Sequence, residues 1–151
     1  VGPVDLTRED FVGRRQASFD QCFTRLHDGS YRHRILANYR AKQDTTNPFV
    51  TWPVINEELL NLALDCIPPE DLECLFRRLM LNIREHRSGF PDLIRFFPGN
   101  TAPDKRYEMI EVKGPGDRLQ DHQMRWLEFF AGEGISASVC YVRWLGNRVM
   151  E

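Results

Sequence analysis

Apolar residues recur at helical spacing through the first half of the chain. In residues 8–27 the apolar positions are three, four and eight apart, at Phe11, Phe19, Cys22, Phe23 and Leu26. This period predicts an amphipathic helix, with Thr7 as its N-cap and two acidic residues in its first turn. A second short helix is expected over residues 31–42.

Two more helices are predicted before the middle of the chain. Residues 57–66 are rich in leucine, and Asn56 stands where an N-cap residue is favoured. A proline pair ends this helix, and Pro69 suits the first position of the next one. The second helix is expected to run on to Ser88 and Gly89.

The second half changes character, because short β-rich segments replace the helical period. Strands are predicted over residues 92–97, 107–112 and 136–144, with a helix over residues 117–132. The order helix, strand, strand, helix, strand indicates an α/β fold with a mixed central sheet flanked by helices. We expect residues 1–67 to form a helical lead-in region that packs on a core formed by residues 68–151.

Length and charge narrow the classes of function. A chain of 151 residues and net charge −2 is long enough for one domain, and its composition does not encode a global attraction to nucleic acid or anionic lipid. Basic residues are nevertheless clustered, for example five against two acidic residues over residues 77–95. Arginine dominates the basic residues, which suits bidentate recognition of phosphate at a local patch.

The chain shows no sign of a membrane span or a secretion signal. The longest apolar run falls far short of the roughly 20 residues that a span requires. We therefore expect an intracellular protein without a membrane partner, and, because the sequence begins with valine, a fragment of a larger protein. The four cysteines, Cys22, Cys66, Cys74 and Cys140, are expected to be buried and reduced.

The candidate chemistry lies in three polar residues of the predicted strands. Asp92 follows Pro91 at the start of one strand, and Glu111 and Lys113 follow 19 and 21 positions later at the end of the next. Residues two apart in a strand point to the same side. Pairing of the two strands is therefore expected to bring the three side chains together, although each of these features is common on protein surfaces.

Two converging carboxylates indicate a divalent cation. Hard oxygen ligands with room for water and phosphate suit Mg²⁺ or Mn²⁺. Such an ion polarises a phosphodiester and lowers the pKa of a bound water, and Lys113 is suited to orient that water or to stabilise developing negative charge. The backbone carbonyl of Val112 is a further candidate ligand at a twisted strand end.

The residues around these positions resemble the VRR-NUC nuclease domain, most closely that of Fanconi-associated nucleases. The resemblance rests on three segments: Arg-Ser-Gly-Phe-Pro-Asp-Leu at 87–93, Glu-Val-Lys-Gly-Pro-Gly-Asp-Arg-Leu at 111–119, and His-Gln-Met-Arg-Trp-Leu at 122–127. It implies a restriction-endonuclease-like core. It also implies metal ligands at Asp92, Glu111 and the Val112 carbonyl, with Lys113 as the catalytic lysine.

The same resemblance implies an activity and partners. The implied activity is metal-dependent hydrolysis of 5′ flaps and branched DNA in crosslink repair, with two ions in the complete site. The implied partners are the other domains of the same nuclease and repair-complex proteins. Such a protein is expected in the nucleoid-containing cytoplasm of a bacterium or in a eukaryotic nucleus. A further metal-ligand glutamate of the family is expected upstream of Val1, since helix packing and capping account for Glu57 and Glu58.

Supporting residues flank the three polar positions. Gln123, on the predicted helix, is a candidate to hold the metal-bound water or the catalytic strand. By resemblance Arg84 and Arg87 belong to a pocket for a 5′-terminal phosphate, and Arg118 is a candidate for phosphate contact. Asp117 is expected to cap its helix, after a glycine-rich turn.

Two alternatives remain open from the sequence. One keeps the metal site but changes the substrate, toward a Holliday junction or a restriction-type target. The other is a DNA-binding module without catalysis, in line with the missing glutamate.

Overall fold

A computed structural model describes residues 3–47, 50–102 and 105–144 of the chain. Its described elements are, in chain order, a 3₁₀ turn (Gly13–Arg15), α1 (Gln16–Asp28), α2 (Tyr31–Lys42), a second 3₁₀ turn (Trp52–Val54), α3 (Glu57–Cys66), α4 (Pro69–Leu81), α5 (Ile83–His86), β1 (Leu93–Phe96), β2 (Tyr107–Lys113), α6 (Asp121–Glu133) and β3 (Ala137–Tyr141). Within these ranges, none of the helices has the length and apolar character needed to cross a bilayer.

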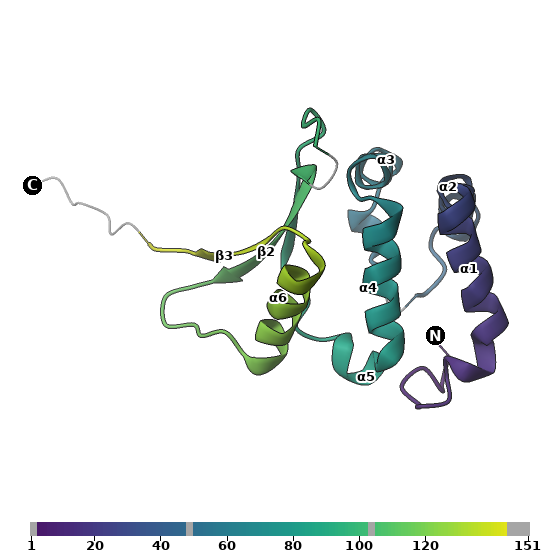
Figure 1. Ribbon diagram of the computed structural model, residues 1–151, viewed down its shortest axis with the longest axis horizontal. Helices are drawn as coiled ribbons and strands as arrows, with labels where there is room; N and C mark the ends of the chain where they lie inside the picture. Colours follow the sequence, from purple (N-terminus) through teal and green to yellow (C-terminus); the bar gives the residue numbers. More distant parts are fainter. Residues whose placement is uncertain (1–2, 48–49, 103–104, 145–151) are drawn as a thin grey trace, which may run out of the picture.

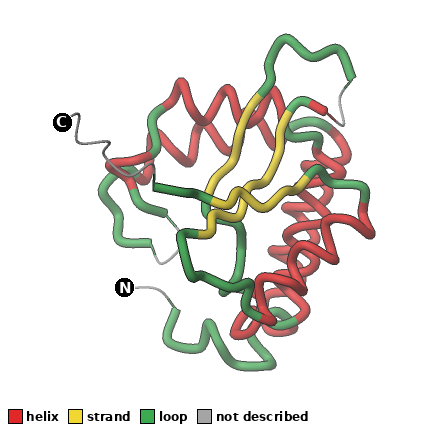
Figure 2. Tube along the Cα trace, turned by 90° about the vertical axis from the view of Figure 1, so that its left-hand side faces the viewer, coloured by secondary structure: helices red, strands yellow, loops and turns green. Residues whose placement is uncertain are grey.

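The three strands form one mixed sheet in the order β1-β2-β3. Strand β1 pairs with β2 antiparallel, and β2 pairs with β3 parallel, joined by the crossover that contains α6. Figure 2 shows the three strands side by side, with helices packed around them. This arrangement confirms the expected α/β class with a mixed sheet flanked by helices.

The helices build outward from the sheet in layers. Figure 1 shows α4 lying between the part of the molecule that holds α6 and the sheet and the part that holds α1 and α2. Helix α1 is joined to α4 by the Arg77 guanidinium, which lies 4.2 Å from the ring centroid of Phe23, and by a contact between His27 and Glu73 at 2.6 Å. The expected division near residue 67 stays a prediction.

The core lies where the inner face of β2 meets α4 and α6. Along β2 burial alternates strictly, so that Tyr107 and Met109 face inward. They pack with Trp126 and Phe130 of α6, which are 1% and 0% exposed. The outer face of β2 is only partly buried, so the sheet is covered by helices mainly on one side.

The N-terminal helix begins later than its apolar period predicts. Residues 4–12 form turns, and α1 starts at Gln16 after the 3₁₀ turn. The prediction of Thr7 as an N-cap is wrong, because Arg15 occupies that position and makes no side-chain cap. Phe11 is buried all the same, so the apolar spacing reports a packed turn there as well as a helix.

The helix that starts at Pro69 is also interrupted. It ends at Leu81, and Asn82, with φ −160° and ψ 90°, separates it from the single turn of α5. The Asn82 side chain then accepts a hydrogen bond from the backbone N–H of Glu85 at 3.2 Å and caps that turn. By contrast α3 spans residues 57–66 as predicted, with Asn56 accepting from the N–H of Leu59.

The thiols are all free, as expected, but not all are buried. Cys66 is buried and Cys74 is partly exposed, whereas Cys22 and Cys140 lie on the surface. The expectation of burial is therefore wrong for two of the four. Cys22 lies at helical spacing from Phe19 and Leu26, yet α1 turns its side chain away from the helices that cover its neighbours.

Candidate active site

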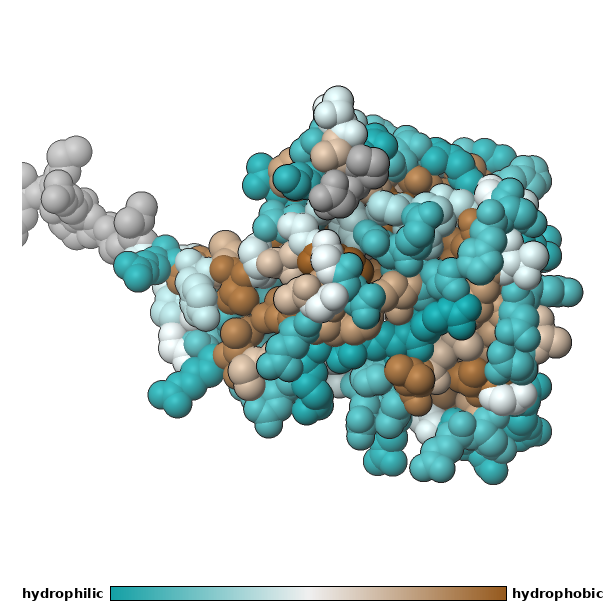
Figure 3. Space-filling view, viewed as in Figure 1, coloured by the Kyte–Doolittle hydropathy of each residue, from teal (hydrophilic) through white to brown (hydrophobic). Residues whose placement is uncertain are grey.

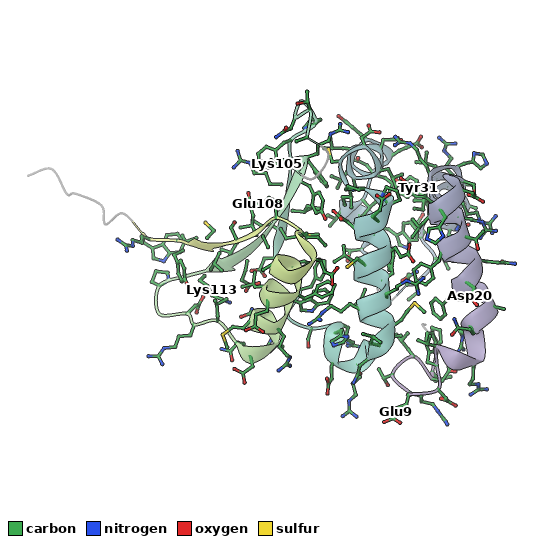
Figure 4. The ribbon with its side chains drawn as sticks, in the orientation of Figure 1. Glu9, Asp20, Tyr31, Lys105, Glu108 and Lys113 are labelled. Atoms are coloured by element: carbon green, nitrogen blue, oxygen red, sulfur yellow. The ribbon has the colours of Figure 1, made fainter. Side chains whose placement is uncertain are left out.

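Strand β2 places Glu111 and Lys113 on its buried face. The alternation that buries Tyr107 and Met109 continues to the end of the strand, so Glu111 is 1% exposed and Lys113 is 6% exposed. Figure 4 shows Lys113 at the end of β2 near α6, with Glu108 farther back along the strand. Two charged groups are thus buried side by side, an arrangement that requires them to compensate each other.

Glu111, Lys113 and Gln123 form a closed hydrogen-bond network. The Lys113 Nζ donates to Glu111 Oε1 at 2.7 Å and to Gln123 Oε1 at 2.9 Å. The Gln123 Nε2 donates to the same Glu111 oxygen at 2.6 Å. Each of the three side chains therefore fixes the other two, and the lysine ammonium is held against the carboxylate.

Gln123 owes its position to the start of α6. Gln120 and Gln123 form a capping box, in which the backbone N–H of Gln120 donates to Gln123 Oε1 at 2.9 Å. The prediction of Asp117 as the helix cap is wrong. Asp117 lies in the preceding loop, where its carboxylate accepts from the backbone N–H of Gly114 at 2.9 Å.

Asp92 meets β2 from the neighbouring strand. It lies directly before β1, and its Oδ2 accepts a hydrogen bond from the backbone N–H of Val112 at 2.9 Å. The N–H and C=O of one strand residue point to the same edge, so the Val112 carbonyl also faces the Asp92 side. The next carbonyl, that of Lys113, faces β3 and accepts from the N–H of Val142 at 2.8 Å.

The donor set fits a hard divalent cation. Lys113 and Gln123 both bond to Oε1 of Glu111, and Val112 bonds to Oδ2 of Asp92. In the described part of the chain, Oε2 of Glu111 and Oδ1 of Asp92 have no partner, and both are oxygen ligands of the kind that Mg²⁺ and Mn²⁺ accept. Over the same ranges no group of three or more His, Cys, Asp or Glu residues is placed to hold a metal.

The segment that leads to Asp92 is held against α6 by hydrogen bonds and a close backbone contact. The Trp126 indole N–H donates to the carbonyls of His86 and Ser88, both at 3.1 Å. Gly89 has φ 79°, and a Cβ there would lie 2.6 Å from the backbone carbon of His122. Only glycine fits this close approach, which aligns Asp92 with the helix that carries Gln123.

Sequence reasoning missed this clamp. The sequence predicts only that Gly89 ends a helix, and it predicts no contact for Trp126. That ring also fills the core by stacking on Phe130 with ring centroids 5.4 Å apart. The signal available in the sequence was the conjunction of a glycine two residues before a Pro-Asp pair and a tryptophan on the following helix. Neither residue alone indicates the contact.

The three predicted phosphate-binding arginines lie outside the network. Arg84 is on α5, Arg87 directly follows it, and Arg118 is in the loop between β2 and α6. All three are exposed, and none has a side-chain hydrogen bond or ion pair within the described ranges. Their guanidinium groups are therefore available to a ligand, while their role stays a prediction.

Glu57 is engaged elsewhere. It forms an ion pair with Arg40, and this hydrogen-bonded guanidinium lowers the pKa of the Glu57 carboxyl. The pair joins α3 to α2.

The mixed sheet, with its acidic and basic side chains at adjacent strand ends, defines a restriction-endonuclease-like α/β domain. Comparison with known families adds the identification: the VRR-NUC domain matches residues 26–144, and the chain belongs to this family. The match begins at the last turn of α1 and ends after β3, so it includes the helices from α2 to α6 and the sheet.

Individual relatives agree with this assignment. The chain is 51% identical over 142 residues to a Fanconi-associated nuclease 1 homolog of Pseudomonas aeruginosa, covering 94% of this chain and 25% of the relative. It is 28% identical over 152 residues to Fanconi-associated nuclease 1 of Homo sapiens, covering 97% of this chain and 14% of the relative. The chain thus spans about a quarter or less of these relatives.

Solved structures show the same fold. A crystal structure described as paFAN1 bound to 2nt 5′ flap DNA with a gap matches with a TM-score of 0.88 and 49% identity, covering 97% of this chain and 26% of that one. A second, described with a 1nt 5′ flap, matches with a TM-score of 0.87 and 50% identity, covering 96% of this chain and 26% of that chain.

Proposed function

We propose that this chain is the catalytic part of a metal-dependent, structure-specific DNA nuclease that hydrolyses phosphodiester bonds at 5′ flaps and branched DNA. The observation that carries the proposal is that Asp92 bonds to the backbone of Val112, the residue between the two charged members of the buried Glu111–Lys113–Gln123 network. The similarity to structures described with 5′ flap DNA supports the choice of substrate.

The proposed metal ligands are Asp92, Glu111 and the carbonyl of Val112. A bound Mg²⁺ or Mn²⁺ supplies positive charge at the scissile phosphate and a more acidic water. Lys113 compensates the charge of Glu111 through Oε1, which leaves Oε2 as the ligand oxygen, while Gln123 fixes the direction of the ammonium. A second ion would need a further acidic ligand beside these two carboxylates.

Recognition of the DNA is assigned to the exposed arginines. Arg84, Arg87 and Arg118 present planar donors that suit phosphate oxygens, and together they flank the segment that leads to Asp92 and the loop that follows Lys113. Crosslink repair, cooperation with other domains and repair proteins, and a location in the nucleoid or nucleus belong to the same proposal.

Cleavage of a labelled 5′-flap duplex by the full-length protein in Mn²⁺ tests the assignment. Asp92→Asn and Lys113→Met are expected to lower the cleavage rate by roughly 10²–10³-fold, because each removes charge at the reacting phosphate. Glu108→Gln, on β2, and Lys105→Met, just before β2, are matched controls, and both variants should cut normally. Undiminished cleavage by Asp92→Asn or Lys113→Met protein rejects the proposed site.

A four-way junction, assayed in parallel, separates the flap nuclease from a junction resolvase. The proposal predicts faster cutting of the flap. Preferential, paired cutting of the junction would instead support the resolvase alternative.

A further inference from the structure

Two aromatic side chains lie exposed just beyond the polar network. Tyr141, the last residue of β3, is 64% exposed, and Trp144 is 80% exposed. Other aromatic residues of this half of the molecule, such as Trp126 and Phe130, are buried in the core. In the described part of the chain both rings are therefore accessible to a ligand.

Tyr141 lies on the same face of the sheet as the candidate catalytic lysine. Lys113 and Tyr141 are register partners in the parallel pair β2–β3, and directly paired residues project to one side. The neighbouring hydrogen bond from the Val142 N–H to the Lys113 carbonyl, 2.8 Å long, fixes this register. The phenol ring is thus one strand away from the network.

A cavity of about 530 Å³ occupies the space between these aromatic residues and the loop after β2. Its lining consists of Gly114, Pro115, Gly116 and Asp117 from the loop and Tyr141, Val142, Arg143 and Trp144 from the chain after β3. The cavity is open to solvent rather than enclosed. Figure 3 shows apolar surface both near the sheet end and over the helices, interspersed with hydrophilic side chains.

The charges of the cavity favour an anionic chain with planar groups. Arg143 lines it and is exposed, and Arg118 follows directly after the lining residue Asp117. Asp117 is the one acidic lining residue, and its carboxylate already accepts from the Gly114 N–H at 2.9 Å. Exposed aromatic rings combined with arginine are the components by which proteins hold single-stranded nucleic acid.

We propose that this cavity is a stacking site for an unpaired nucleotide of the DNA strand next to the scissile phosphate. The base stacks on both Tyr141 and Trp144, and Arg143 contacts the backbone. The inference rests on the proposed nuclease function and deepens it. It assigns to the site the recognition of an unpaired DNA segment beside the scissile phosphate.

Binding of a labelled 5′-flap DNA to the full-length protein in EDTA tests the site without cleavage. Tyr141→Ala and Trp144→Ala are each expected to weaken binding about tenfold, the loss that follows from removing one base–aromatic contact. Tyr141→Phe keeps the ring and should bind normally. Tyr141→Leu keeps apolar bulk without a π-face and should bind as weakly as Tyr141→Ala.

Abasic nucleotides in the flap separate stacking from a structural effect. With the wild-type protein, removing the stacked base should weaken binding by about the same tenfold factor, and the alanine variants should lose nothing further. If the variants bind the intact flap as tightly as wild type, the stacking site is wrong. It is also wrong if they weaken intact and abasic flaps equally relative to wild type, which would assign the rings to contacts with the rest of the protein.

The same experiment keeps the two proposals apart. If wild-type protein cuts the flap in Mn²⁺ while the aromatic variants bind and cut like it, only the stacking site fails. If wild-type protein neither binds nor cuts the flap, the proposed function fails and the stacking site with it.

Discussion

The two ends of strand β2 carry buried polar side chains on the same face, yet they differ in character. At the first end the Tyr107 hydroxyl, on a side chain 1% exposed, donates to Asp71 Oδ2 of α4 at 2.7 Å. Burial and the Asp71 carboxylate raise the pKa of Tyr107, so the phenol stays neutral. At the other end two opposite charges, Glu111 and Lys113, are buried with Gln123.

The difference shows what separates a structural polar contact from a functional one. The phenol end joins the sheet to a helix through a neutral donor inside the core. The charged end adjoins Asp92, a loop and a cavity, and it retains one carboxylate oxygen that no described residue engages. Burial alone is similar at both ends, and the unused ligand oxygens mark the candidate site.

The substitution Gln123→Leu, at the charged end of β2, is expected to have the largest effect, and that effect is on the rate of cleavage. Loss of the amide removes the hydrogen bonds that orient Lys113 and Glu111, and flap cutting is expected to fall 10–100-fold. The neighbouring exposed Met124→Leu is the matched control. Rate constants and unfolding midpoints measured together should show lost rate without a comparable loss of stability. Normal cutting by Gln123→Leu protein would show that the buried polar contacts are structural at both ends of β2.

A smaller effect, on stability rather than rate, is expected at the phenol end. Tyr107→Phe removes a hydrogen bond to a carboxylate and should lower the free energy of unfolding by about 1.5–3 kcal/mol. Flap cutting at a temperature where the variant is folded should not change. Urea titration and the cleavage assay measure the two quantities, and a slower rate in the folded variant would contradict the division between the two ends.

The smallest expected effect is on the reactivity of the cysteine thiols. Burial, with Glu133 nearby, raises the pKa of Cys74 to about 11. The protonated thiol therefore makes its full contribution to the free energy of unfolding below about pH 9, near its ordinary pKa. That contribution is lost as the pH rises toward 11. At pH 8 a thiol reagent should label Cys22 and Cys140 quickly and Cys74 slowly, and equally fast labelling of Cys74 would contradict its placement.

Much of the fold follows from local sequence signals. Helix α3 was predictable because a capped leucine-rich stretch leaves one solution. The strict alternation along β2 is in its burial and not in its sequence, because Glu111 and Lys113 lie on the buried face while the apolar Val112 lies on the other. The start of α6 was not predictable, since Asp117 is a good capping residue in isolation and only the turn at Gly114 shows that it is used elsewhere. The break at Asn82 has the same cause, because a side chain that caps α5 resembles an ordinary polar helix residue.

The site divides along the same line. Spacing on a strand was enough to predict that Glu111 and Lys113 share a face. The structure adds Gln123, which bonds to Lys113, and places Asp92 against the backbone of Val112 between them. The clamp between Gly89 and α6 depends on two segments that are far apart in the sequence. The same holds for Tyr141, which the parallel register alone places beside Lys113.

Anomalous scattering from crystals of the protein soaked in Mn²⁺ tests the central claim most directly. The account predicts a peak within coordination distance of both Glu111 Oε2 and Asp92 Oδ1, lost in crystals of Asp92→Asn protein whose fold is unchanged. A peak elsewhere, or no peak while Glu111 stays bound to Lys113 and Gln123, would contradict the proposal that these two carboxylates hold the metal.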